Sequence, residues 1–215
     1  DTTTISIDDV TVDEGSGTAT IDASVDNAPE TDLTITLSNG ATIVIAAGET
    51  TGTSSAFAIQ GDDPYVDGSV ETLTIDSTAG GNYEQLDATD TALVTVEDTI
   101  DATTVSFNDP VVDEGGNITL TATLDNPADG ALTINLDNGE TITIADGASS
   151  GSVTFLAPDD VYQGGNDFDV AIDSTSGGNF EQLITNDVAN ITVNDDLDTT
   201  TISIDDVTVD EGSGT

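Results

Sequence analysis

The sequence ends as it begins. Residues 1–18, DTTTISIDDVTVDEGSGT, return letter for letter as residues 198–215, and a diverged copy, DATTVSFNDPVVDEGG, occupies residues 101–116. Repetition at a period of this size indicates tandem domains. We expect two whole repeats, residues 1–100 and 101–197. Residues 198–215 are then the N-terminal strand fragment of a third repeat.

That fragment has too few residues for a core of its own. If it is ordered, either the preceding repeat or a neighbouring molecule must cover its apolar residues, which are Ile202, Ile204, Val207 and Val209.

Short alternating runs of apolar residues predict strands throughout both repeats. Residues 19–25 and 33–37 alternate cleanly, and Asn39-Gly40 and Asn138-Gly139 are strong hairpin signals. The first strand is expected to be irregular at Asp8 and Asp9. A strand is also expected to run toward Phe57 and Ile59. The fold class we predict is all-β, with tandem immunoglobulin-like Greek-key β-sandwiches of about seven strands each.

The charge excludes several classes of partner and reaction. The chain has 43 Asp and Glu, no Lys, Arg, His or Cys, and a formal charge of -43. Nucleic acids and anionic membrane surfaces attract basic patches, so we expect no nucleic-acid partner and no direct membrane insertion. Histidine bases, Schiff bases, thiolate nucleophiles and disulfides are absent, and we expect no enzyme. Because 35% of the residues are apolar, the acidity does not indicate disorder.

Strand order predicts where the carboxylates lie. Successive strands of a sandwich mostly reverse direction, so the first corner, the loop before the sixth strand and the chain exit share one end of each repeat. In the first repeat this end collects Asp13, Glu14, Asp62, Asp63, Asp67, Glu97 and Asp98. In the second repeat it collects Asp113, Glu114, Asp159, Asp160, Asp195 and Asp196, with Asp167 in compensation for the Gly164 that replaces Asp67. The joints add Asp101 and Asp198.

Such a crowd of carboxylates requires a cation. Two carboxylates ~4 Å apart repel each other by about 4 kcal/mol at a surface-like dielectric, and no basic side chain relieves this. Calcium accepts six to eight oxygen ligands in tolerant geometry, whereas magnesium needs a stricter octahedron and zinc prefers Cys and His. We therefore predict Ca2+ as the cofactor. The alternative is that these charges form a solvated surface that keeps the protein soluble.

Three motifs carry a family resemblance: DEG after the first strand, DDPYVDG or DDVYQGG before the sixth, and VEDT or VNDD at the exit. They resemble the Calx-β calcium motif. With the tandem duplication and the absence of basic residues, the chain is similar to the extender region of giant bacterial RTX adhesins, which include biofilm adhesins. The resemblance implies ligands at Glu14, Asp62, Asp63, Glu71, Asp98, Glu114, Asp159, Asp160 and Asp195. Glu71 departs from the pattern, because Phe168 is its counterpart in the second repeat.

The resemblance implies an extracellular spacer at the bacterial cell surface. In this interpretation, Ca2+ stiffens the joints and neighbouring repeats of the same chain are the partners. The sequence identifies no target for the parent adhesin. A glycan- or surface-binding β-sandwich module and a salt-adapted halophilic protein are the alternatives. Tyr83 and Phe180, in the matching segments GGNYEQL and GGNFEQL, are predicted either to close the open end of a sandwich or to pack on the preceding domain.

Overall fold

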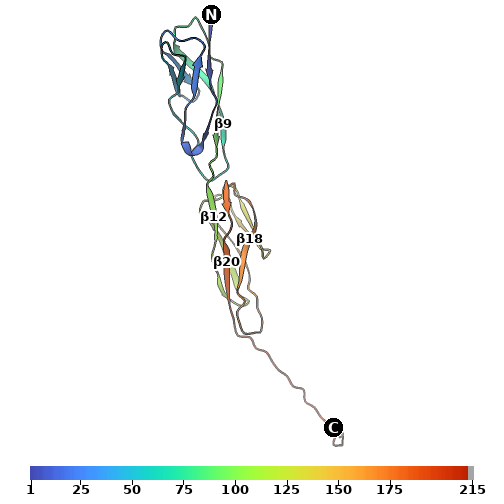
Figure 1. Ribbon diagram of the computed structural model, residues 1–215. Coiled ribbons are helices and arrows are strands. Elements are labelled where there is room, and N and C mark those ends of the chain that lie inside the picture. Colours follow the sequence, from blue (N-terminus) through green and yellow to red (C-terminus); the bar gives the residue numbers. More distant parts are fainter. Residues whose placement is uncertain (213–215) are drawn as a thin grey trace. The chain divides into compact units, whose positions relative to one another are not determined.

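The computed structural model describes residues 1–212. The chain divides into two compact units. The first comprises Asp1–Thr103 together with Asn179–Leu183, and the second comprises Thr104–Gly178 and the chain from Ile184 onward. Strands dominate both units (Figure 1). Within residues 1–212 no helix is long and apolar enough to cross a lipid bilayer.

The first unit is built from two sheets. One has the strand order β10 (Gln85–Asp87), β1 (Thr2–Ile7), β4 (Asp22–Val25), β7 (Thr51–Thr53). The other has the order β2 (Val10–Asp13), β11 (Thr91–Glu97), β9 (Ser69–Gly80), β5 (Leu33–Leu37), β6 (Thr42–Ile45). A short pair, β3 (Thr18–Ala19) with β8 (Phe57–Ala58), adds to these sheets. The predicted all-β, immunoglobulin-like fold class is confirmed.

The first strand changes sheet at the expected irregularity. β1 pairs with β4 in one sheet, whereas β2 runs parallel to β11 in the other. At the break the carboxylate of Asp9 accepts a hydrogen bond from the backbone N–H of Leu93 at 2.7 Å, and that of Asp90 accepts one from the N–H of Ile7 at 2.9 Å. The two aspartates satisfy backbone donors that a continuous ladder would otherwise pair.

The strand expected to run toward Phe57 and Ile59 is divided into β7 and β8. Ser54 lies in the gap, and its hydroxyl accepts a hydrogen bond from the N–H of Ile21 at 2.9 Å. The Ser54 N–H in turn donates to the Ile21 carbonyl at 2.8 Å. A side-chain oxygen therefore takes the place of a ladder carbonyl, which interrupts both strands at the same point.

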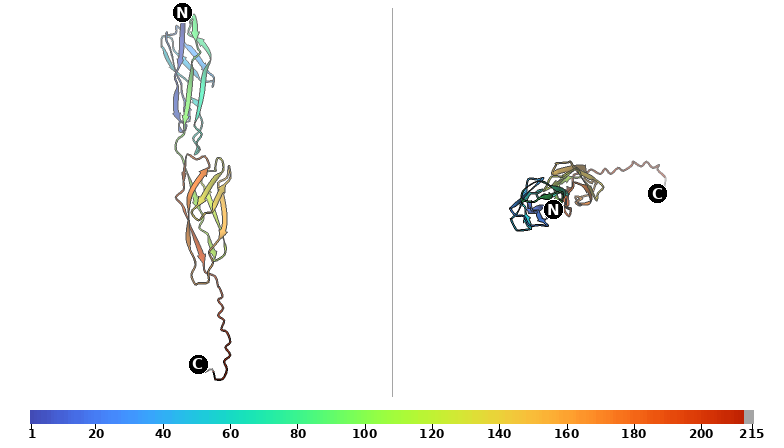
Figure 2. Two further views of the ribbon diagram at one scale, coloured as in Figure 1. Left: turned by 90° about the vertical axis from the view of Figure 1, so that its right-hand side faces the viewer. Right: turned by 90° about the horizontal axis from the view of Figure 1, so that it is seen from above.

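The second unit repeats the two-sheet arrangement with fewer breaks. One sheet has the order β17 (Ser150–Leu156), β14 (Asn117–Leu124), β12 (Ala102–Phe107), β19 (Gln182–Ile184). The first two residues of β12 and of β19 are grouped with the first compact unit. The other has the order β13 (Val111–Asp113), β20 (Val188–Asn194), β18 (Phe168–Gly177), β15 (Leu132–Leu136), β16 (Thr141–Ile144). β18 and β20 run side by side and antiparallel in this second sheet (Figure 2). β14 and β17 are continuous here.

The core of each unit lies between its two sheets. Alternate residues of β5, including Leu33 and Ile35, are fully buried, as are their counterparts Leu132 and Ile134 on β15. The predicted hairpin between β5 and β6 is confirmed, with its glycine, Gly40, at a φ of 85°. Asn39 has no positive φ, and the hydrogen bonds of Gly40 N–H to the Leu37 carbonyl and of Leu37 N–H to the Ala41 carbonyl, both at 2.8 Å, enclose a three-residue loop whose last residue is the left-handed Gly40.

Residues 198–212 contain no strand. The apolar side chains of this segment are exposed: Ile202 by 86%, Ile204 by 90%, Val207 by 85% and Val209 by 69%. A strand needs a neighbouring strand for its backbone hydrogen bonds and a core for its apolar side chains. This segment has neither, so no strand is expected here. Residues 213–215 of the expected fragment lie outside the described residues.

Candidate metal centre

The first carboxylate group of interest lies where β2 ends. β2 and β11 run in parallel, with Asp13 opposite Glu97, so the next residue on each strand approaches the same point. Those residues are Glu14 and Asp98. The chain turns at once through a 3-10 turn, Glu14–Ser16, which closes with a hydrogen bond from the Gly17 N–H to the Glu14 carbonyl at 3.0 Å.

Glu14 is fully buried, which is rare for a carboxylate in a chain without basic side chains. Its Oε1 accepts a hydrogen bond from the backbone N–H of Thr99 at 3.1 Å. Its Oε2 is buried and has no hydrogen-bond partner among the described residues, and the same holds for Oδ1 of Asp98. Buried acceptors without partners cost free energy unless another ligand satisfies them.

Glu14, Asp67 and Asp98 each offer a carboxylate oxygen, and these oxygens all lie within 4.8 Å of one another. They come from the first corner, the loop before β9 and the end of β11. The side-chain amide of Gln60 donates to Asp67. Asp62 lies beside the group, where its Oδ1 accepts a hydrogen bond from the hydroxyl of Thr99 at 2.6 Å.

The electrostatics of this group disfavour ionisation of Glu14. Burial raises the pKa of the Glu14 carboxyl above 4.5, and the negative charges of Glu181, Asp98 and Asp62 raise it further, against the hydrogen bond from Thr99. Glu181 belongs to the first compact unit. Its Oε2 accepts a hydrogen bond from the Asp101 N–H at 2.6 Å, while its Oε1 is buried and has no hydrogen-bond partner within residues 1–212.

The second unit has a group of four carboxylates, which are Glu114, Asp159, Asp196 and Asp198, with ligand oxygens within 4.8 Å of one another. Glu114 is 5% exposed, and its Oε2 has no partner among the described residues. Burial raises the pKa of Glu114, as do the charges of Asp160 and Asp195. Burial also raises the pKa of Asp198, with Asp196 the largest charge contribution.

Asn166 orients two acids of the second unit. Its side-chain amide donates to Oε1 of Glu114 and to Oδ2 of Asp160, each at 3.1 Å. Oδ1 of Asp160 accepts the Tyr162 N–H at 2.8 Å. These two hydrogen bonds hold the pKa of Asp160 below its ordinary value, the one from Tyr162 more than the one from Asn166. Asp160 is therefore kept ionised beside the group.

The other predicted residues of the first repeat lie outside its group of three. Asp13 and Glu97 are exposed and opposite each other on β2 and β11. Oδ1 of Asp63 accepts the Tyr65 N–H at 2.9 Å. Glu71 is exposed on β9, and Asp101 is exposed at the joint.

In the second repeat, three predicted residues remain outside the group of four besides Asp160. Oδ1 of Asp167 accepts the Val193 N–H at 2.9 Å and so holds the loop to β20. Oδ1 of Asp113 accepts the amide of Asn194 at 3.4 Å. Asp195 acts on Glu114 through its charge.

Sequence reasoning missed Glu181, Asn166 and Thr99. Glu181 stands in GGNFEQL, whose counterpart GGNYEQL carries Glu84, so the shared acid was a visible signal. The role expected for this segment rests on its aromatic residue, Phe180, and gives the acid no part in the site. No comparable signal marks Asn166 or Thr99, since neither is charged.

The donor set suits a hard divalent cation. All available side-chain ligands are oxygens, because the chain has no His or Cys. The partnerless buried oxygens of Glu14, Asp98 and Glu114 supply the acceptors that such an ion satisfies. Calcium coordinates oxygen ligands in tolerant geometry, whereas magnesium needs a stricter octahedron and zinc prefers His and Cys.

When calcium is removed by a chelator, lowering the pH is expected to stabilise the protein. Because the folded-state pKa of Glu14 and Glu114 is raised above 4.5, the folded protein binds protons more tightly than the unfolded chain. Stability is then lost as the pH rises through the folded pKa. The melting temperature in EDTA should rise when the pH is lowered from neutrality toward 4.5.

Below the ordinary pKa of an aspartate carboxyl the trend should reverse. The pKa of Asp160 is lowered in the folded protein, so its ionised form stabilises the fold, and this stability is lost when Asp160 is protonated. In the double variant Glu14→Gln/Glu114→Gln the melting temperature should rise much less on acidification. In Glu97→Gln, which changes an exposed acid, the rise should be unchanged. A melting temperature independent of pH in this range would contradict the burial of ionised carboxylates.

Comparison with known families gives one match over most of the chain. The model of the LapA domain matches residues 1–99 and 101–196. No curated protein matches the chain.

Three solved structures are among those to which the chain is similar. A tetra-tandem repeat from the extending region of a large adhesion protein is 21% identical, with 87% of this chain and 48% of that chain covered and a TM-score of 0.43. The calcium binding domain CBD12 of CALX1.1 is 11% identical, with 88% and 99% covered and a TM-score of 0.38. The I9-I11 tandem from titin is 15% identical, with 91% and 67% covered and a TM-score of 0.28.

Proposed function

The chain belongs to the LapA domain family, a family of large adhesins, and from this premise we propose that its repeats are spacers stiffened by Ca2+. The chain is a structural module of an adhesin. Adhesin families of this kind act at the cell surface. In the proposal, the repeats project a distal adhesive region of an RTX adhesin away from a bacterial cell.

The observation that carries the calcium proposal is the burial of Glu14. A carboxylate that is fully buried, with one oxygen lacking a partner, sits beside Asp98 in a chain with no basic side chain. A bound cation relieves both the repulsion and the missing contact. Glu114 in the second unit has the same burial and the same partnerless Oε2.

Stiffening follows from where the ligands lie along the chain. β11 ends at Glu97 and β12 begins at Ala102, so Asp98 is the first residue of a four-residue linker. A cation held by Glu14, Asp67 and Asp98 ties that linker to the first corner and to the loop before β9. The direction in which the chain leaves the sandwich is then fixed. Asp196 and Asp198 occupy the corresponding exit of the second repeat.

The proposed ion also suits the proposed location. Extracellular calcium modules bind with dissociation constants of about 0.1–1 mM, which extracellular fluids saturate and cytosol does not. Magnesium is the main competitor in such fluids, and its demand for octahedral geometry at short distances disfavours these sites.

Small-angle X-ray scattering tests the spacer role. In calcium, the 215-residue chain should scatter as a single conformation; in EDTA, it should require an ensemble with a wider spread of dimensions. Circular dichroism must show that the strands persist, so that linker freedom is separated from unfolding. At a calcium concentration near the native dissociation constant, Glu14→Gln, which removes a ligand at the first linker, should scatter more like the EDTA sample than the native chain does. Identical profiles in calcium and EDTA would leave a folded adhesin module without the stiffening role.

A further inference from the structure

In the first compact unit the loop before β9 pairs with the segment around Phe180, and this pairing is the model for the contact proposed below. Tyr65, in the loop before β9, forms an antiparallel bridge with Phe180. The Val66 N–H donates to the Asn179 carbonyl at 3.0 Å, and the Glu181 N–H donates to the Pro64 carbonyl at 3.1 Å. The rings of Tyr65 and Phe180 lie 5.8 Å apart between centroids, at a tilt of 31°. Backbone hydrogen bonds, an aromatic pair and a hydrogen bond from the side-chain amide of Asn179 to the Val66 carbonyl at 3.4 Å make this contact.

The sequence of one of the two paired segments, residues 179–181, recurs in similar form at residues 82–84. Asn82-Tyr83-Glu84 matches Asn179-Phe180-Glu181, within GGNYEQL and GGNFEQL. Both asparagines have a positive φ, 60° for Asn82 and 53° for Asn179, so the two loops share a backbone shape.

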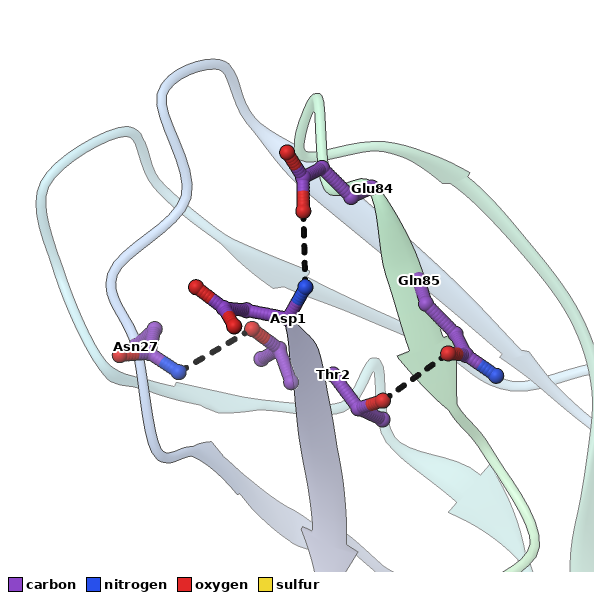
Figure 3. A network of polar contacts seen from close by, with 6 residues as sticks. Asp1, Thr2, Asn27, Glu84 and Gln85 are labelled. Atoms are coloured by element: carbon purple, nitrogen blue, oxygen red, sulfur yellow. Dashed lines mark hydrogen bonds and ion pairs between the residues drawn. The ribbon is translucent and has the colours of Figure 1, made fainter.

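The contact at the base of the loop recurs as well. Oε2 of Glu84 accepts a hydrogen bond from the backbone nitrogen of Asp1 at 2.7 Å (Figure 3). Oε2 of Glu181 likewise accepts one from the Asp101 N–H at 2.6 Å. The Glu84 side chain is 82% exposed. Tyr83 is half-buried against the core of the first unit and donates its hydroxyl to the Asn27 carbonyl at 2.7 Å, so the loop is held in this conformation within the single chain.

The other half of the bridge recurs at residues 161–163. Val161-Tyr162-Gln163 in DDVYQGG matches Pro64-Tyr65-Val66 in DDPYVDG. The preceding aspartate shapes both segments in the same way. Asp160 accepts the Tyr162 N–H at 2.8 Å, and Asp63 accepts the Tyr65 N–H at 2.9 Å.

This second edge is open. Tyr162 is 75% exposed and Val161 is 59% exposed, whereas Tyr65 is half-buried. A cavity of about 90 Å³ lies beside them, lined by residues 161–163 and 195–198. An exposed aromatic on a segment that lies outside any strand is a surface suited to strand-like pairing.

We propose that Val161–Gln163 is the docking edge for the Asn82–Glu84 loop of a second copy of this chain, with Tyr162 and Tyr83 paired as Tyr65 and Phe180 are. The occupant is a further copy because residues 198–215 restart the sequence of residues 1–18, so the next repeat has the same beginning. The inference rests on the proposed function in that repeats follow one another, but the contact itself uses no ion. Edge and loop are different surfaces, so the contact can recur from copy to copy without closing.

Engineered disulfides test the pairing, because the chain has no Cys of its own. Extending the chain after Thr215 with residues 19–197 continues the array without an artificial junction. Tyr162→Cys in the first copy is combined with Tyr83→Cys in the second. Paired residues of this bridge type have Cα atoms about 4.5 Å apart, within the range of about 4.4–6.8 Å that a disulfide spans.

Two control pairs of cysteines give reference rates of disulfide formation. Tyr65→Cys with Phe180→Cys in the first copy should close, since it copies the observed bridge. Tyr162→Cys in the first copy with Thr72→Cys in the second has a similar tether and an exposed cysteine on β9, so it measures chance encounters. We expect the Tyr162/Tyr83 pair to oxidise at least about tenfold faster than this chance pair, with and without calcium, by mass spectrometry of alkylated protein.

Each outcome decides the matter. Closure at the chance rate, while the Tyr65/Phe180 pair closes, overturns the docking edge. Failure of both pairs removes the template and the inference with it. Fast closure in a protein whose melting ignores calcium keeps the docking edge and refutes the calcium role. If melting depends on calcium but the Tyr162/Tyr83 pair does not close, the calcium role stands and the docking edge is refuted.

Discussion

Removing calcium with EDTA should lower the melting temperature of this protein by about 10–20 °C from its value in 10 mM Ca2+. A ligand at 100 times its dissociation constant stabilises the folded state by ~2.7 kcal/mol, and ~0.1 mM is typical of tight extracellular calcium modules. For domains of this size each kcal/mol moves the midpoint by about 4–8 °C. The buried carboxylates Glu14 and Glu114 are the physical source of the effect. Differential scanning calorimetry at fixed pH measures it.

The control must separate binding from screening. A chain with a formal charge of -43 is stabilised by any added salt, because its carboxylates repel one another. The same melt should therefore be run in 10 mM Mg2+ and in NaCl of equal ionic strength. Equal midpoints in calcium, magnesium and sodium would reduce the effect to screening and refute the site.

Glu14→Gln should shift stability in opposite directions with and without calcium. In EDTA the variant should melt at a higher temperature than the native chain, because an amide does not carry a buried charge beside Asp98. In calcium it should melt at a lower temperature, because a carboxylate ligand is lost. The affinity at this site should fall at least about tenfold, since ligand charge sets affinity in such sites. Isothermal titration calorimetry measures this loss.

Matched variants localise the effect. Glu114→Gln should reproduce the crossing for the second unit, whose group includes Asp159, Asp196 and Asp198. Glu97→Gln removes an exposed acid one residue before Asp98 and should shift neither curve beyond screening. A variant of Glu14 that is less stable under both conditions would show a purely structural role for this side chain.

Much of the fold could be predicted from local patterns. Alternation defined β5 and β15, and Asn-Gly defined the turns that follow them, because both signals act within a few residues. The interruption at Asp8 and Asp9 was visible because two adjacent acids cannot face a core. The break at Ser54 was not, since it depends on a hydroxyl reaching Ile21, 33 residues away in the sequence.

The site could be predicted only to the level of loops. Strand direction places the loops that carry Asp62 and Asp63 at one end, but it does not orient their side chains. Asp63 turns back to the N–H of Tyr65, whereas Asp62 faces the hydroxyl of Thr99. In the second repeat Asp159 joins the group and Asp160 lies beside it, so neighbouring acids again differ. Such choices are made by hydrogen bonds to residues that carry no charge signal.

The switch of the first strand from one sheet to the other has a mechanical consequence. Val10–Asp13 of β2, which follows the entry strand β1, lie in parallel register with residues 94–97 of β11, the strand by which the chain leaves the repeat. Tension between the start and the end of the repeat pulls β2 and β11 in opposite directions along their length, so the hydrogen bonds that join them are loaded in shear and must fail together. An antiparallel pair pulled from its open end instead peels apart one bond at a time. The topology therefore places the load on its most resistant pairing.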